Sequence, residues 1–284
     1  MRLPNLFTVP GDVLAGFLLA GIATRNKDYD CKSLLFCMGA SVCVYCAGLL
    51  QNDYCDRKKD AAFRPDRPIP AGLISADSVV SVAMVMFLLG LLSSWAAGAF
   101  PLIVCVAMVC TVISYNCLTK KIALLGAMNM GLCRGLNLLL GASVLGHTGL
   151  ISETTLVSAG FLTIYIGTLT LMAYDEQTPS KLGVWRWLLL IIMVCWFVSL
   201  PALPIDRAVI CIFGGIALLG AVIQTIKVGG CPDVKERQHF IGGMVRVLIL
   251  IQATIVCIAS PPLAVILLIA WVASNRLSNY FYSS

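Results

Sequence analysis

Apolar segments long enough to cross a bilayer recur along almost the whole chain and limit the folds open to it. Nine such segments are followed by a shorter tenth: 6–24, 33–50, 77–97, 99–116, 123–146, 154–173, 185–202, 207–226, 241–259 and 262–274. A helix spans the hydrocarbon core with about 20 apolar residues. Open sheets leave backbone groups unpaired in lipid. We therefore expect an all-α, polytopic membrane bundle of about nine transmembrane helices, with a short tenth.

The composition excludes a soluble enzyme, a disordered chain and a nucleic-acid-binding module. Hydrophobic residues make up 59% of the 284 residues and charged residues only 12%. The expected partner is the lipid bilayer, with no nucleic acid, because the net charge of +6 is typical of basic cytoplasmic loops.

The distribution of Lys and Arg predicts the orientation. With the N-terminus inside and ten spans, fourteen of the 20 basic residues lie inside and four outside. The positive-inside rule then makes loops 51–76, 117–122, 174–184 and 227–240 cytoplasmic. Function is expected on that side.

The most informative motif follows the second apolar segment and reads N-D-x-x-D-x-x-x-D, formed by Asn52, Asp53, Asp56 and Asp60. In a helix, Asn52, Asp56 and Asp60 share one face. Clustered carboxylates repel one another, and hard oxygen ligands suit Mg²⁺ together with substrate phosphates. The alternative is a solvated polar segment whose acids pair with the neighbouring bases Arg57, Lys58 and Lys59.

A proline-rich segment, R-P-D-R-P-I-P-A-G at 64–72, follows the acidic motif. Its prolines predict a stiff loop. Arg64 and Arg67 are therefore expected near the acids, where guanidinium groups suit phosphate. The alternative is that they only anchor the loop on the cytoplasmic side.

The two motifs together resemble the UbiA superfamily of intramembrane prenyltransferases, and the resemblance covers most of the chain. It implies a single UbiA-like transmembrane domain, 1–284, with two pseudo-repeats at roughly 1–122 and 123–284. It also implies a Mg²⁺-dependent enzyme that moves a prenyl group from a prenyl diphosphate to an aromatic or other lipophilic acceptor. The alternative is a non-catalytic relative that binds or exports a prenylated or diphosphate-bearing precursor.

Two later segments also resemble family motifs. Tyr115 and the following Lys120 and Lys121 look like the family's Tyr-plus-Lys stretch, which implies diphosphate contacts from one of the lysines. Asp175 and Glu176 occupy the place of the family's second acidic motif. The resemblance implies that both are metal ligands and that Asp175 also contacts the substrate. Pro179 occupies the position of that motif's second Asp, so a full second Mg²⁺ site is not implied.

Arg134 and Asn137 lie within the fifth apolar segment, where ionisable residues are costly and usually face a polar interior. Arg134 either binds diphosphate or forms an interhelical ion pair. Gly131 and Gly135 predict a close helix contact. Arg246 is a weaker candidate of the same kind.

The expected roles combine these motifs. Catalysis is assigned to Asp53, Asp56, Asp60 and Lys120; substrate binding to Asn52, Arg64, Arg67, Tyr115, Lys121, Arg134, Asn137 and Asp175; and metal binding to Asn52, Asp53, Asp56, Asp60, Asp175 and Glu176. The opening L-P-N-L-F-T and the segment G-L-C-R-G-L-N resemble the EboC-like branch of the superfamily, and the expected location is the bacterial inner membrane.

Overall fold

The computed structural model describes residues 6, 8–25, 30–174, 182–199, 207–230 and 232–281. Over these residues the regular structure is helical. The α-helices are α2 (Val9–Thr24), α3 (Cys31–Phe63), α4 (Ala76–Ala97), α5 (Ala99–Cys117), α6 (Ala123–Ala142), α7 (Gly146–Leu150), α8 (Glu153–Ala173), α9 (Leu188–Ser199), α10 (Arg207–Lys227), α11 (Val234–Ala259) and α12 (Pro261–Phe281). Short 3₁₀ turns lie at η1 (Thr119–Lys121), η2 (Ser143–Leu145) and η3 (Gly183–Trp187).

The prediction of an all-α membrane bundle is confirmed. Seven helices in the described ranges are long and apolar enough to cross a membrane, and three shorter apolar helices accompany them. Each of the ten predicted apolar segments contains helix, although α12 continues to Phe281, beyond the predicted end at 274. The chain is therefore a multi-pass integral membrane protein. The two pseudo-repeats stay a prediction.

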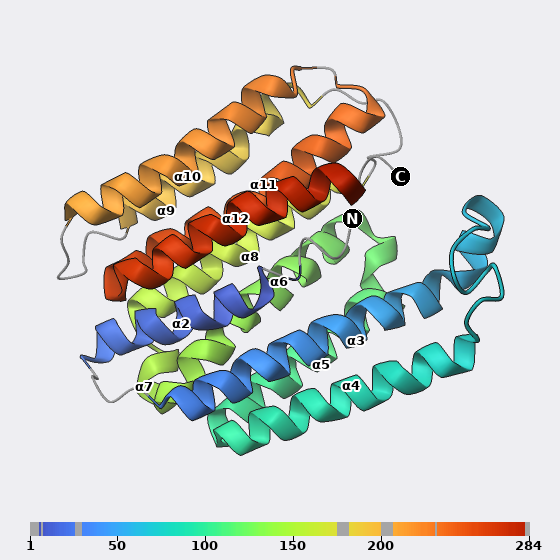
Figure 1. The fold of residues 1–284 in the computed structure, drawn as a ribbon, viewed down its shortest axis with the longest axis horizontal. Helices are drawn as coiled ribbons and strands as arrows, with labels where there is room; N and C mark the ends of the chain where they lie inside the picture. The colour runs from blue at the N-terminus through green and yellow to red at the C-terminus, as the bar shows by residue number, and fades with distance from the viewer. Residues whose placement is uncertain are drawn as a thin grey trace.

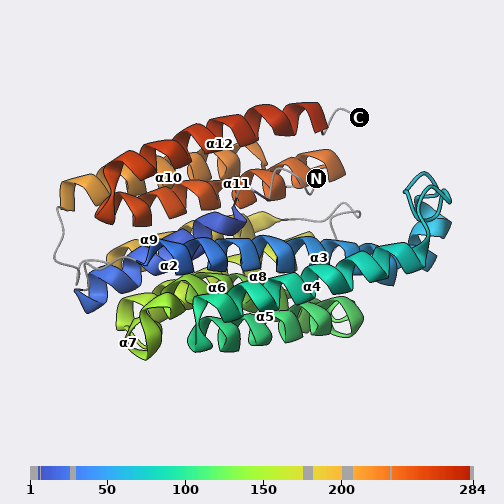
Figure 2. The same cartoon turned by 60° about the horizontal axis from the view of Figure 1, so that its bottom comes forward.

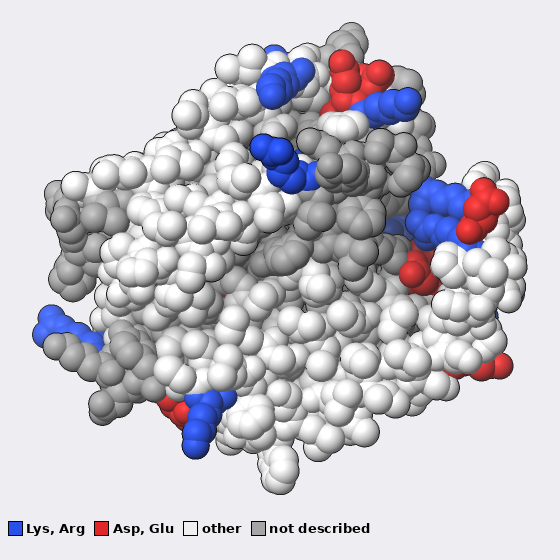
Figure 3. All heavy atoms as spheres, viewed as in Figure 1, with Lys and Arg blue, Asp and Glu red and all other residues white. Residues whose placement is uncertain are grey.

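The helices run side by side in three groups (Figures 1 and 2). α3, α4 and α5 lie on one side, α9, α10, α11 and α12 lie on the other, and α2, α6 and α8 lie between them. The core includes most of α11, whose apolar stretch is 78% buried. Charged atoms are concentrated towards the ends of the bundle on the face shown in Figure 3, as expected for helices with their middle in lipid.

Small residues allow the central helices to approach closely. A side chain at Gly16 or Gly141 would collide with a backbone carbonyl across the α2–α6 contact. Gly131 and Gly135 of α6 face the α8 carbonyls of Thr163 and Ala159 in the same way. The close contact predicted from the G-x-x-x-G spacing is confirmed, and it brings Arg134 into the centre of the bundle.

α3 is longer than a bilayer requires. Its 33 residues span about 50 Å at the usual helical rise, against roughly 30 Å of hydrocarbon. Asp30 begins the helix by accepting hydrogen bonds from the amides of Lys32 and Ser33. The helix ends at Phe63 because Arg64 precedes a proline, and this position disfavours helical backbone. The extra length places the acidic motif on the last turns of the helix, at the end of the bundle that we call the motif end (Figure 2).

Candidate active site

An internal cavity of about 390 Å³ lies between α2, α3, α5, α6, α8 and α11. Its α3 wall runs from Ser41 through Val44 and Gly48 to Asn52, a distance of about 16 Å along the helix axis. Most of the lining is apolar, but Arg134 and Asn137 also contribute to it. The cavity therefore connects the first residue of the acidic motif with the buried interior of the bundle.

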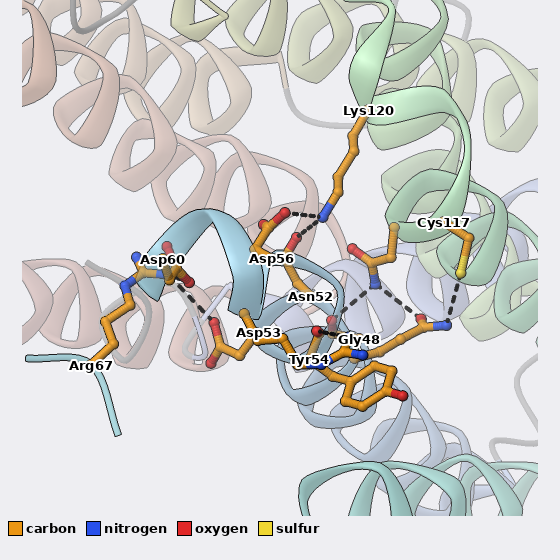
Figure 4. Close-up of polar contacts among 12 residues, drawn as sticks. Gly48, Asn52, Asp53, Tyr54, Asp56, Asp60, Arg67, Cys117 and Lys120 are labelled. Atoms are coloured by element: carbon orange, nitrogen blue, oxygen red, sulfur yellow. Dashed lines mark hydrogen bonds and ion pairs between the residues drawn. The ribbon is translucent and has the colours of Figure 1, made fainter. Parts of the chain in front are cut away.

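Lys120 lies between two oxygens of the acidic motif (Figure 4). Its ammonium is 2.7 Å from Oδ1 of Asp56 and 3.2 Å from Oδ1 of Asn52. The lysine belongs to η1, directly after α5, where the backbone of Thr119 and Lys120 packs against Gly126 of α6. Asn52 and Asp56 are one helical turn apart, so their oxygens converge on one cation.

The proline-rich segment folds back onto the acidic helix, as Figure 4 shows. Nη1 of Arg67 lies 2.7 Å from Oδ2 of Asp60 and 3.8 Å from Oδ1 of Asp53. The side chain of Asp60 is only 9% exposed and that of Asp53 38% exposed. Arg67 therefore holds the loop against the helix through a nearly buried carboxylate, while Asp53 keeps access to solvent.

The basic residues that adjoin the motif in sequence do not pair with its acids. Nη1 of Arg57 donates to the carbonyl of Tyr54 at 2.8 Å, and its guanidinium stacks over the Tyr54 ring. Lys58 and Lys59 are exposed. Arg67 of the proline-rich segment and Lys120 of the turn after α5 pair with the acids instead.

The remaining predicted site residues divide into three groups. Tyr115 lines the cavity beside Asn52. Arg64 and Lys121 are exposed, and their side chains form no ion pair with any residue in the described part of the chain. Asp175 and Glu176 fall outside the described residues.

Two residues that the motif analysis did not single out connect α5 to α3 through hydrogen bonds, just before the acidic motif in sequence. Nδ2 of Asn116 donates to the carbonyl of Gly48 and to Oε1 of Gln51, both at 3.0 Å. Nε2 of Gln51 in turn contacts Sγ of Cys117 at 3.7 Å. These contacts fix the separation between α3 and the turn that carries Lys120. Their sequence signal is weak, because Asn116 and Gln51 are single amide residues that belong to no recognisable spacing pattern.

Arg134 is held in a buried polar network. Its Nη1 lies 2.9 Å from Oδ2 of Asp12, whose side chain is fully buried. Asp12 also accepts hydrogen bonds from Nδ2 of Asn137 at 3.1 Å and from Nε2 of Gln252 at 2.6 Å. The network joins α2, α6 and α11. Of the two sequence-based interpretations of Arg134, the interhelical ion pair is the one observed.

Arg237, which the sequence placed among loop charges, is buried near the end of α8. Its Nη2 donates to the carbonyl of Met172 at 2.6 Å, and the residue is 5% exposed. A capping box formed by Asp233 and Glu236 starts α11 and positions this arginine. This buried cation contacts α8 at Met172, three residues before Asp175 of the second acidic motif in sequence.

The oxygen donors suit Mg²⁺ in kind and in arrangement. Among the described residues, no group of three or more His, Cys, Asp and Glu residues is close enough to hold a metal. Asn52 and Asp56 nevertheless already direct two hard oxygens at a single cation, and Asp53 lies on the same helix end. Mg²⁺ typically binds through one or two carboxylates and completes its shell with substrate phosphates and water. The residues present fit such an ion.

The fold and the site define a polytopic helical membrane protein with an acidic helix end at the mouth of an internal cavity. The family model described as the UbiA prenyltransferase family matches residues 13–274. The chain belongs to this family, and the resemblance of its motifs is confirmed. Placement in the EboC-like branch stays a prediction.

Curated relatives match parts of the chain. The digeranylgeranylglyceryl phosphate synthase of Methanothermobacter thermautotrophicus is 36% identical over 138 residues, 48% of this chain and 47% of that protein. The enzyme of the same name from Methanosarcina barkeri is 30% identical over 52% of this chain and 54% of that protein. The chloroplastic chlorophyll synthase of Avena sativa is 32% identical over 36% of this chain and 29% of that protein. The first two matches span about half the length of each relative.

Two solved structures share the fold. The apo structure of a UbiA homologue from Aeropyrum pernix K1 aligns with a TM-score of 0.70 at 13% identity, covering 90% of this chain and 98% of that one. A structure described as concerning digeranylgeranylglyceryl phosphate synthase in membranes aligns with a TM-score of 0.63 at 16% identity, covering 91% and 98%. At these identities the likeness concerns the fold alone.

Proposed function

We propose that the protein is a Mg²⁺-dependent intramembrane prenyltransferase that moves a prenyl group from a prenyl diphosphate to a lipophilic acceptor. The observation that carries the proposal is the position of Lys120, Asn52 and Asp56 at the mouth of a largely apolar cavity. A prenyl diphosphate has the same division, with a charged head and an apolar tail.

The head of the donor would lie at the motif end. Lys120 and Arg67 supply positive charge on opposite sides of the acidic helix turn. Mg²⁺ held by Asn52, Asp53 and Asp56, with Asp60 and the second motif residues Asp175 and Glu176 as further candidates, would carry charge of the departing diphosphate. Fixed cations aimed at a developing negative charge stabilise the transition state.

The tail would occupy the central cavity, between α3, α5, α6, α8 and α11. Its walls include Val44, Met108, Leu169 and Val245. In the reaction, the bond between the first prenyl carbon and the diphosphate oxygen breaks and its electron pair leaves with the diphosphate. A nucleophilic atom of the acceptor then bonds to the allylic carbon and loses its proton. The apolar walls of the cavity would protect the allylic carbocation, which is left when diphosphate departs, from reaction with water.

The proposed orientation in the membrane follows from the distribution of basic residues among the loops. The motif end would face the cytoplasm, because the loops there hold most of the basic residues, and the membrane would be a bacterial inner membrane. Soluble donor could then enter from the side where it is made.

Diphosphate release by the purified full-length protein tests the proposal. The assay combines several prenyl diphosphates with aromatic and lipid acceptors, in Mg²⁺ or in EDTA, and identifies products by mass spectrometry. We expect prenylated acceptor and diphosphate in equal amounts, in Mg²⁺ only. Binding of the donor without release of diphosphate under any condition would favour the non-catalytic alternative, in which the protein carries or presents the precursor.

A further inference from the structure

A second cavity, separate from the first, opens between α10, α11 and α12. Its volume is about 770 Å³. It lies towards the motif end of these three helices, since its lining includes Lys227 near the end of α10 and Lys235 in the first turn of α11. The two cavities have no lining residue in common. α11 separates them, with Val245 in the central cavity and Arg246 in the second.

The second cavity is strongly basic. Its charged lining consists of one acid, Glu236, and four permanent cations: Lys227, Lys235, Arg246 and Arg276. None of the four cations forms an ion pair with a residue that the structure describes. The carboxylate of Glu236 is already engaged with the backbone amide of Asp233 at 3.1 Å. The residues that the structure describes therefore do not neutralise the positive charge of this cavity.

Arg246 is the one of these four cations that is buried. It is 7% exposed and lies in the middle of α11, about 18 Å from the start of the helix. Its Nε donates to Oδ1 of Asn275 at 2.8 Å, which is a neutral partner. Arg134, the other arginine within an apolar span, has the carboxylate of Asp12 at 2.9 Å. A buried charge requires a counter-charge, and at Arg246 the described residues supply none.

The surroundings suit a ligand with both an anionic and an apolar part. Trp271 lines the cavity, and its ring is of the type that settles at the interface of lipid and water. Beside the opening, Ile223 of α10 and Val272 of α12 are 42% and 50% exposed. In Figure 3, blue atoms of Lys and Arg are visible over this end of α10, α11 and α12, next to a white surface.

We propose that this cavity binds the phosphate head group of an anionic membrane lipid, with Arg246 as the inner contact and Lys227, Lys235 and Arg276 around the rim. Basic pockets between transmembrane helices bind such head groups, and the planar guanidinium of Arg246 suits phosphate oxygens. The acyl chains follow the apolar surface of α10 and α12. This site is distinct from the proposed prenyl diphosphate site, and its occupancy does not require transferase activity.

Calorimetric titration of the full-length protein in detergent tests the site. The probes are short-chain phosphatidylglycerol, short-chain phosphatidylcholine and inorganic phosphate. We expect phosphatidylglycerol to bind at least about tenfold more tightly than either of the other two, since net charge and apolar chains both contribute. Equal binding of phosphatidylcholine, or equal binding of inorganic phosphate, would overturn the assignment to an anionic lipid.

Variants place the binding in this cavity. Arg246→Gln should weaken phosphatidylglycerol binding about tenfold. The double variant Lys227→Gln/Arg276→Gln changes only exposed cations, so it keeps the test available if Arg246→Gln fails to fold, and it should weaken binding similarly. Lys58→Gln/Lys59→Gln removes two exposed charges elsewhere at the motif end and should change the affinity less than about twofold. Equal losses in this control and in the cavity variants would refute the site.

Discussion

The ammonium of Lys120 lies 2.7 Å from the carboxylate of Asp56, although 64 residues separate them in the chain. The contact joins the turn after α5 to the last part of α3, at the mouth of the central cavity. It also distinguishes Lys120 from its neighbour Lys121, which is exposed and contributes only its carbonyl, to the hydroxyl of Tyr174 at 2.9 Å.

The two lysines therefore provide a matched pair. Lys120→Gln should lower kcat/KM for prenyl diphosphate by about 100-fold, because it removes a fixed charge at the site of diphosphate departure. Lys121→Gln should lower it less than about threefold, as for an exposed surface charge. Steady-state release of diphosphate measures both. A larger loss of kcat/KM in Lys121→Gln than in Lys120→Gln would mean that Lys121, and not Lys120, contacts the substrate.

The clamp between Arg67 and Asp60 should show energetic coupling. Arg67→Gln leaves a nearly buried carboxylate without its cation, so we expect the free energy of unfolding to fall by about 1–3 kcal/mol. Asp60→Asn should recover part of this loss when combined with Arg67→Gln. Chemical denaturation in detergent gives the four values of the cycle. Arg64→Gln, at an exposed position directly before Pro65, serves as the control and should be near neutral. Additive losses would show that the clamp does not act as a unit.

The buried pair of Asp12 and Arg134 predicts an effect on folding. Asp12→Asn leaves the guanidinium buried without a counter-charge and should cost about 3–5 kcal/mol of stability. Arg134→Gln in the same chain should restore part of it. The comparison variant is Arg246→Gln, which leaves no carboxylate unpaired and should cost less than Arg134→Gln alone. Thermal unfolding in detergent ranks the variants, and a reversed order for the two arginine variants would contradict the assigned pairing.

The shape of the central cavity predicts selectivity for chain length. Val245→Phe adds bulk to the α11 wall and should raise KM for long prenyl donors more than for short ones. Leu219→Phe changes an exposed position on α10 and is the matched control. Competition between a long and a short donor in one reaction gives the ratio of their kcat/KM values directly. An unchanged ratio in Val245→Phe would place the tail elsewhere.

The sequence predicts the helices well because membrane spans are long and each carries its own hydrophobic signal. The length and composition of the segment 33–50 sufficed to place a span there, and the proline after Arg64 sufficed to end α3. Spacing alone also predicted that Asn52 and Asp56 share a helix face. These are local properties, which require no knowledge of the neighbouring helices.

The pairing of charges could not be predicted in the same way. Arg57 adjoins Asp56 in sequence, yet it stacks on Tyr54, and Lys120 takes the place at the acid. Arg134 and Arg246 give the same signal of an arginine within an apolar segment. Among the described residues, however, only Arg134 meets a carboxylate, from a helix more than 100 residues away. Such partners depend on which helix faces pack together, and uniformly apolar helices carry little information about their faces.

Metal–phosphorus contact measured by electron paramagnetic resonance tests the central claim most directly. Mn²⁺ replaces Mg²⁺, and a thiodiphosphate analogue of the prenyl donor supplies the phosphorus atoms. We predict a hyperfine coupling between Mn²⁺ and ³¹P for the wild type and for Asp77→Asn, which changes an exposed acid at the same end of the bundle, and its loss in Asp56→Asn. An undiminished coupling in Asp56→Asn would contradict the assignment of the acidic end of α3 as the site that binds the metal and the diphosphate.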